Sequence, residues 1–86
     1  MKFAYTYALR CVDGDLYIGS TDDLKRRMRE HGEGKCDNTR KRLPVELVYF
    51  EGCRSLAAAR EREKQLKTGF GRGYLRKRLA FAFTDS

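Results

Sequence analysis

The opening segment of the chain alternates between large apolar side chains and small or polar ones. The larger side chains fall at every second position, at Phe3, Tyr5, Tyr7, Leu9 and Cys11. A period of two is typical of a β-strand with one covered face. The turn-forming residues Asp-Gly-Asp follow at 13–15, and residues 16–20 resume the apolar pattern. The sequence therefore predicts an N-terminal β-hairpin.

The length of the hairpin loop decides which face each tyrosine occupies. A two-residue loop at Asp13 and Gly14 places Tyr7 and Tyr17 on opposite faces. A three-residue loop over 13–15 pairs Cys11 with Tyr17 and places both tyrosines on one face. A site that uses both tyrosines needs the second arrangement, which is the one that we expect.

A helix is predicted directly after the hairpin. Thr21 is a suitable N-cap, and the two aspartates at 22–23 place negative charge in the first turn, where it suits the helix dipole. The pattern continues to about His31, and Gly32 and Gly34 end it. Residues 34–44 are polar and basic, which indicates a loop.

The second half of the chain predicts one strand and two helices. Residues 45–51 are apolar enough for a central or well-covered strand. Ser55 is a suitable N-cap for a helix to about Thr68. Glycines at 69, 71 and 73 are expected to break the chain before a final helix over 73–82. The predicted fold is α+β, a single domain over 1–86 with the order ββαβαα and a three-stranded mixed or antiparallel sheet flanked by helices.

Size, charge and cysteine content narrow the functional class. The chain has 86 residues and a net charge of +7, so a polyanionic partner such as nucleic acid competes with a merely solvated basic surface. Three widely spaced cysteines and one histidine favour neither a disulfide framework nor a zinc site. No apolar run approaches the ~20 residues that span a bilayer, and the N-terminus lacks signal-peptide features, so we expect a cytoplasmic protein without membrane contact.

Glu63 stands where the predicted second helix should be buried. It shares one helical face with Leu56, Ala59 and Leu66, whereas Glu61 points toward water. A buried carboxylate is costly unless it meets a cation or a metal ion. The alternative is a glutamate at the edge of the apolar stripe, paired with a neighbouring arginine.

Four other residues have the chemistry of a phosphodiesterase and also an ordinary structural explanation. Tyr7 and Tyr17 are phenols able to handle a nucleophilic water, but tyrosine is common in strands. Arg27 adjoins the apolar stripe of the first helix, although most arginines on such a helix are solvated. His31 lies one turn beyond Arg27 and is also typical of a helix end.

Taken together, these residues resemble the GIY-YIG nuclease domain. The likeness rests on Tyr5-Thr6-Tyr7, Tyr17-Ile18-Gly19, Arg27, His31 and Glu63. It extends from Phe3 to about Leu79 and is strongest toward the small stand-alone bacterial branch, which is related to the nuclease domain of the excision-repair incision subunit. The first motif departs from its name, since Tyr5-Thr6 replaces Gly-Ile. Ser20 stands where the repair nuclease has a lysine, so no role is carried over for that lysine.

The resemblance implies hydrolysis of DNA phosphodiester bonds with one divalent metal ion, Mg²⁺ or Mn²⁺, in repair or recombination. Glu63 is then the metal ligand, Arg27 holds the phosphate, and one of the two tyrosines activates water, with His31 in the same active site. Which tyrosine acts as the base stays open. With no room for a recognition domain, sequence specificity is expected to be low or supplied by a protein partner.

Basic segments provide expected contacts to the nucleic acid backbone, which position a substrate without reading its sequence. These residues are Asn38, Thr39, Arg40, Arg72, Arg76 and Lys77. Two other classes remain open: a non-catalytic nucleic-acid-binding module of the same fold, and an accessory protein that docks on a larger complex.

Overall fold

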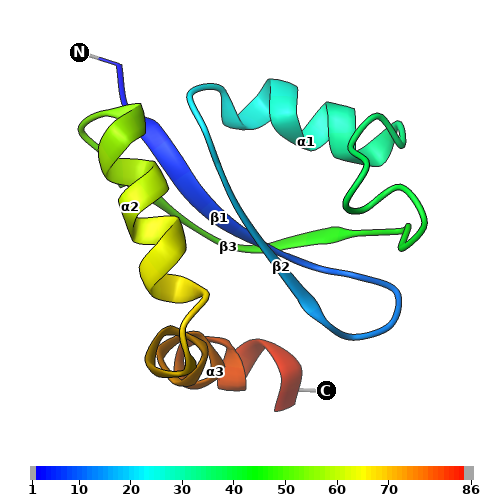
Figure 1. The fold of residues 1–86 in the computed structure, drawn as a ribbon. Coiled ribbons are helices and arrows are strands. Elements are labelled where there is room, and N and C mark those ends of the chain that lie inside the picture. The colour runs from blue at the N-terminus through cyan, green and yellow to red at the C-terminus, as the bar shows by residue number, and fades with distance from the viewer. Residues whose placement is uncertain (1, 85–86) are drawn as a thin grey trace.

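The structure, a computed structural model, describes residues 2–84 and follows the predicted order ββαβαα (Figure 1). Its elements are β1 (Ala4–Arg10), β2 (Leu16–Thr21), α1 (Leu24–Gly32), β3 (Glu46–Cys53), α2 (Leu56–Leu66) and α3 (Gly69–Thr84). The α+β class and the three-stranded sheet are therefore confirmed. Within residues 2–84, none of the helices has the combined length and apolar character needed to cross a membrane.

The sheet is antiparallel throughout, with the strand order β2-β1-β3. The expectation that the third strand is central or well covered is wrong, because β1 occupies the centre and β3 forms an edge. Leu47 and Phe50 on β3 are accordingly 37% and 53% exposed. An apolar sequence does not separate an edge strand from a central one, because one covered face already accounts for many of its apolar residues.

The hairpin loop has the expected length but a different position. Cys11 faces Asp15, donating its N–H to the Asp15 carbonyl at 2.9 Å, and the three loop residues are therefore 12–14. Gly14 closes the turn with a φ of 87°, a left-handed conformation that favours glycine. Tyr17 consequently pairs with Leu9, two residues from the expected Cys11. Because a shift of two preserves the face, Tyr7 and Tyr17 still lie on one side of the sheet.

Helices cover the two faces of the sheet differently (Figure 1). Ala8 and Ile18 face α2 and α3, where Leu66 and Leu75 complete the buried core. Tyr7 and Tyr17 point to the opposite face, where their rings contact His31 of α1. The edge strand β2 thus carries side chains toward both layers.

The helix starts follow local hydrogen bonding. Ser55 caps α2 as predicted, accepting a hydrogen bond from the N–H of Ala58. The N-cap of α1 is Asp23, however, and not Thr21. Thr21 ends β2, and its hydroxyl accepts from the N–H of Asp23, which leaves the Asp23 carboxylate to cap Arg26.

The third helix begins four residues earlier than predicted, at Gly69. Thr68 starts it, since its hydroxyl accepts a hydrogen bond from the N–H of Gly71. A Cβ on Gly71 would collide with the carbonyl of Gln65 and the Cα of Leu66. Gly71 therefore permits the close approach of α3 to the end of α2 and does not break the helix.

Candidate active site

The most deeply buried part of the site is a series of three hydrogen-bonded side chains. Tyr7, His31 and Thr39 are 1%, 0% and 0% exposed. The Tyr7 hydroxyl lies 2.8 Å from His31 Nε2, and His31 Nδ1 lies 2.7 Å from Thr39 Oγ1. The strand β1, the helix α1 and the loop that follows α1 each supply one member. Sequence reasoning placed the first two in the site and expected Thr39 to contact nucleic acid.

Gly19 of the Tyr17-Ile18-Gly19 motif has no side chain and so leaves space for the Tyr7 ring. It lies opposite Tyr7 in the sheet, and a Cβ on Gly19 would stand 2.5 Å from the Tyr7 hydroxyl oxygen. The same atom would stand 3.1 Å from the ring of Tyr17. The glycine therefore lets the two tyrosine rings lie over the strand, with centroids 6.4 Å apart.

Arg27 differs from the solvated arginines around it. Its side chain is 34% exposed and its Nη1 donates to Glu30 Oε1 at 3.1 Å, while its guanidinium also interacts with the Tyr7 hydroxyl. That second interaction raises the already high pKa of Arg27, so the residue stays charged.

Burial and the charge of Arg27 change the pKa values of Tyr7 and His31. Loss of solvation raises the pKa of Tyr7 to about 12, although the Arg27 guanidinium opposes the rise. Loss of solvation, reinforced by the charge of Arg27, lowers the pKa of His31 below its usual value. At neutral pH, Tyr7 is therefore a neutral phenol and His31 a neutral imidazole.

Glu63 reaches the site from the other face of the sheet. Its side chain is 22% exposed, and Ser20 at the end of β2 donates to its Oε1 at 2.6 Å. Lys67, the C-cap residue directly after α2, donates to its Oε2 at 2.6 Å. The helical face predicted for Glu63 is therefore the observed one, and its cationic partner is a lysine in place of the arginine considered above.

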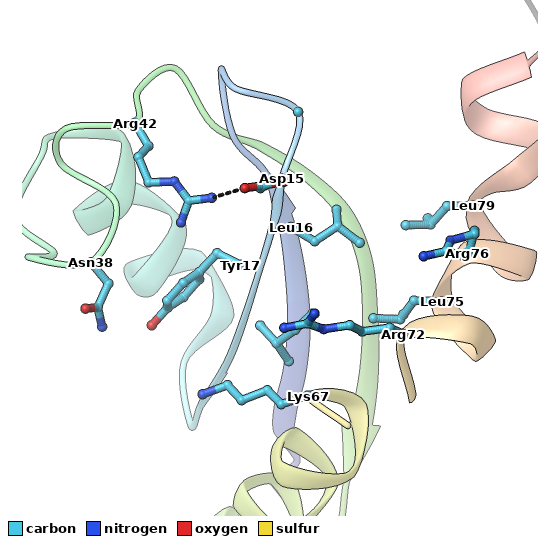
Figure 2. A pocket seen from close by; sticks show the side chains of 12 residues that line it. Asp15, Leu16, Tyr17, Asn38, Arg42, Lys67, Arg72, Leu75, Arg76 and Leu79 are labelled. Carbon is cyan, nitrogen blue, oxygen red and sulfur yellow. Dashed lines mark ion pairs between the residues drawn. The ribbon is translucent and has the colours of Figure 1, made fainter. Parts of the chain in front are cut away.

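A pocket of about 840 Å³ runs along β2 and joins the two faces (Figure 2). Tyr17 projects into it from the α1 side, where Asn38 also lies. It is also lined by Lys67, at the end of α2, and by Arg72 and Arg76 of α3. The pocket thus places a partly exposed phenol and several cations around the strand that separates Tyr7 from Glu63.

The residues expected to contact nucleic acid fall into different places. Asn38, Arg72 and Arg76 line the pocket, whereas Arg40 is exposed and paired with Asp37 at 3.5 Å. Lys77 is exposed on α3 and is absent from the pocket lining. Thr39 is enclosed by the protein.

Among the cations that line the pocket, sequence analysis missed two, Lys67 and Arg42. Arg42 pairs with Asp13 at 3.2 Å and with Asp15 at 3.9 Å, which ties the basic loop to the hairpin. Lys67 had a recognisable signal, because a glutamate followed four residues later by a lysine is a common helical ion pair. Arg42 had none, since its partners come from a distant turn.

Oxygen donors at Glu63 fit a hard divalent cation. No group of three or more His, Cys, Asp or Glu side chains between residues 2 and 84 is arranged to hold a metal ion. Mg²⁺ does not require one, because it keeps several waters and often uses one or two carboxylates. Glu63 would hold the ion beside the Ser20 hydroxyl once Lys67 leaves Oε2. The cysteines at 11, 36 and 53 are free thiols and lie outside this donor set.

Comparisons with known proteins identify relatives over about three quarters or more of the chain. A UPF0213 protein from Streptococcus pneumoniae serotype 4 is 48% identical over 65 residues, which cover 74% of this chain and 66% of that protein. A UPF0213 protein from Haloquadratum walsbyi is 43% identical over 67 residues, or 77% of this chain and 75% of that protein. The solution NMR structure of a UPF0213 protein from Bacillus halodurans matches with a TM-score of 0.53 and 34% identity, covering 85% of this chain and 81% of that one.

The likeness to the Bacillus halodurans structure extends to the fold. The family described as the GIY-YIG catalytic domain matches residues 3–77, a range that contains both tyrosine motifs, Arg27, His31 and Glu63. The chain therefore belongs to the GIY-YIG family.

Proposed function

We propose that the protein is a metal-dependent endonuclease that hydrolyses DNA phosphodiester bonds with low intrinsic sequence specificity. The observation that carries the proposal is the pocket along β2, where Tyr17 lies among Lys67, Arg72 and Arg76. Glu63 adjoins this pocket through Lys67, and Arg27 adjoins it through the Tyr7–Tyr17 ring cluster. A phosphodiester in the pocket would meet positive charge on several sides.

The two tyrosines are suited to different tasks. Tyr17 is only partly buried and its ring enters the pocket, so its hydroxyl can reach a water there. Tyr7 is 1% exposed and its hydroxyl already contacts His31. We therefore assign Tyr17 as the residue that orients the attacking water and accepts its proton, and Tyr7 as the residue that positions Arg27 and His31.

Positive charge in and beside the pocket has two proposed roles. Arg27 remains ionised and stabilises the charge that develops on the phosphate oxygens. Arg72 and Arg76 of α3, with Asn38 on the other side, hold the nucleic acid backbone.

A bound Mg²⁺ or Mn²⁺ would supply Lewis-acid charge at the phosphate, with Glu63 as its protein ligand. Ser20 fixes the Glu63 carboxylate for that task.

The proposal also covers how a cleavage site is selected and in which cellular process the protein acts. Contacts to the backbone carry no sequence information, so a DNA structure or a protein partner would select the cleavage site. Repair or recombination in the cytoplasm is the setting that fits such a substrate, and the free cysteines are compatible with a reducing compartment.

Nicking of supercoiled plasmid in Mg²⁺ or Mn²⁺ tests the proposal. We expect cleavage by the unmodified protein, its loss with a chelator, and a fall of roughly 10²–10³-fold or more in Glu63→Gln and Arg27→Gln. Glu61→Gln and Arg29→Gln are matched controls, because both residues are exposed on the same two helices. Cleavage that survives in Glu63→Gln would contradict the assigned site.

A non-catalytic nucleic-acid-binding module is the second candidate, and the Lys67–Glu63 ion pair favours it. The ammonium already neutralises the carboxylate at 2.6 Å, so the fold needs no metal ion to balance this charge. Salt-sensitive binding of DNA by every variant, without cleavage of plasmid or branched DNA, would support this candidate over the enzyme.

A further inference from the structure

Thr39 is one of two side chains that hydrogen-bond the His31 ring among the described residues. Its hydroxyl lies 2.7 Å from His31 Nδ1, and the opposite ring nitrogen lies 2.8 Å from the Tyr7 hydroxyl. The two ring nitrogens of a neutral imidazole are not equivalent, since one carries a hydrogen and the other accepts one. The partner at Nδ1 therefore helps to decide what Nε2 can do.

Main-chain hydrogen bonds hold the backbone of Thr39 independently of its side chain. The Cys36 carbonyl accepts hydrogen bonds from the N–H groups of Thr39 and Arg40, at 3.1 and 2.9 Å. The Thr39 carbonyl accepts in turn from the N–H of Arg42 at 2.8 Å. Gly34, with a φ of 75°, reverses the chain after α1 and brings this loop back toward His31. The loop thus holds the hydroxyl in place by main-chain bonds.

The positive charge of Arg27, which lies beside Tyr7, sets the direction of the hydrogen bonds between Tyr7, His31 and Thr39. The Arg27 guanidinium has hydrogens and no acceptor, so it favours a Tyr7 hydroxyl that turns its oxygen lone pairs toward Arg27. The hydroxyl hydrogen then points to His31 Nε2, which must accept it. With Nε2 accepting, the imidazole hydrogen is on Nδ1 and is donated to Thr39 Oγ1.

The reverse direction is poorer. If Thr39 donated to Nδ1, the hydrogen on Nε2 would point at the Tyr7 oxygen, where Arg27 already interacts. Two donors would then compete for one phenol oxygen beside a cation. Among the described residues each direction leaves one hydroxyl hydrogen without an acceptor, that of Thr39 in the first and that of Tyr7 in the second, so this competition is what separates them. Since the three side chains are buried, such a mismatch has no water to relieve it.

We propose that Thr39 is a positioning residue that fixes His31 as the tautomer with its hydrogen on Nδ1, so that Tyr7 donates to Nε2 and presents its oxygen to Arg27. Tyr7 then helps to hold the Arg27 guanidinium, the group that the proposed function assigns to the phosphate. This role in cleavage rests on the proposed nuclease function, whereas the tautomer itself does not.

Nitrogen NMR of the imidazole provides the direct test, because His31 is the only histidine of the chain and its signals need no assignment. We expect protein labelled with ¹⁵N-histidine at pH 7.5 to show a protonated Nδ1 and an unprotonated Nε2. Thr39→Ser keeps the hydroxyl and should keep this pattern. Thr39→Val removes the hydroxyl at similar size and should shift the signals toward the other tautomer or an average of the two.

Cleavage measured on the same variants separates positioning from folding. We expect Thr39→Val to lower cleavage activity by roughly 10–100-fold, the range known for residues that orient a metal-bound histidine, and Thr39→Ser to recover most of it. A protonated Nε2 in the unmodified protein, or an unchanged spectrum in folded Thr39→Val, would overturn the proposal. If Thr39→Val does not fold, the tautomer of the unmodified protein and of Thr39→Ser still decides the matter. If no variant cleaves DNA, the nuclease function fails while the tautomer result stands.

Discussion

The two halves of the candidate site are built in different ways. On the α1 face, Tyr7, His31 and Thr39 are at most 1% exposed and are joined by hydrogen bonds. On the α2 face, the side chains of Glu63 and Lys67 are 22% and 52% exposed and are joined by one ion pair. Folding therefore completes the first half, whereas the second half stays open to solvent and ligands.

This difference indicates which half should move when a ligand binds. Rearranging the buried chain would leave polar groups without partners, at about 1–3 kcal/mol for each. An exposed ion pair of the Lys67–Glu63 kind contributes only about 0–1 kcal/mol. We therefore expect substrate and metal ion to rearrange the α2 half and to leave the α1 half as it is.

The tyrosines give the sharpest test, because they share a face but differ in burial. Tyr17→Phe should lower cleavage by roughly 10²–10⁴-fold with little change in stability, since it removes a group that handles a proton at the open pocket. Tyr7→Phe should instead lower the free energy of unfolding by about 1–3 kcal/mol, because His31 Nε2 loses its buried partner. Plasmid nicking and thermal unfolding of both variants would check this. The reverse pattern would show that Tyr7 is the base.

A smaller effect is expected from tightening the buried half. Gly19→Ala places a methyl group 2.5 Å from the Tyr7 hydroxyl oxygen and 2.6 Å from its ring carbon Cζ, so the ring must shift. Overpacking of this kind costs about 1–3 kcal/mol, which chemical denaturation measures.

Gly52→Ala is the matched control for this change. Gly52 is also a strand glycine, but an added Cβ there meets the Phe3 ring at an ordinary 3.8 Å, and we expect little change in stability. Equal stabilities of the two variants would show that the rigid half tolerates movement, and the contrast between the halves would then be lost.

Sequence patterns predicted the parts of the molecule that depend on neighbours along the chain. The period of two gave the strand β1, the helical spacing of Leu56, Ala59 and Leu66 turned Glu63 toward the sheet, and Ser55 capped its helix as its residue type suggests. The shared face of the tyrosines was expected because a common site requires it, since the loop length itself left both parities of the register open.

Features that depend on tertiary contacts were not predictable in this way. Gly71 looked like a helix breaker until the backbone of α2 was placed against it. Thr39 looked like a surface residue of a basic loop, because nothing nearby in the sequence reveals that the loop returns over His31. The exposure of Phe50 likewise follows from the position of β3 at the edge.

The smallest predicted effect concerns the open half and its response to metal ions. The Lys67 ammonium and a divalent cation need the same oxygen, Oε2 of Glu63. Lys67→Met removes this competitor and should strengthen Mn²⁺ binding by up to about fivefold, the factor that corresponds to 1 kcal/mol for an exposed pair. Electron paramagnetic resonance of free Mn²⁺ during a titration measures this affinity without requiring cleavage.

Lys64→Met serves as the control for Lys67→Met, because Lys64 is exposed on the same helix and its removal changes the net charge equally. Stronger Mn²⁺ binding in Lys67→Met alone would identify Glu63 as the ligand and Lys67 as the group that it displaces. Equal strengthening in both variants would point to general electrostatics, since any lost positive charge favours a cation nearby. Unchanged binding in Lys67→Met would mean that Mn²⁺ does not use Oε2, and that the ion pair is a permanent part of the α2 half. The open half would then be as fixed as the buried one, and the distinction between them would rest on exposure alone.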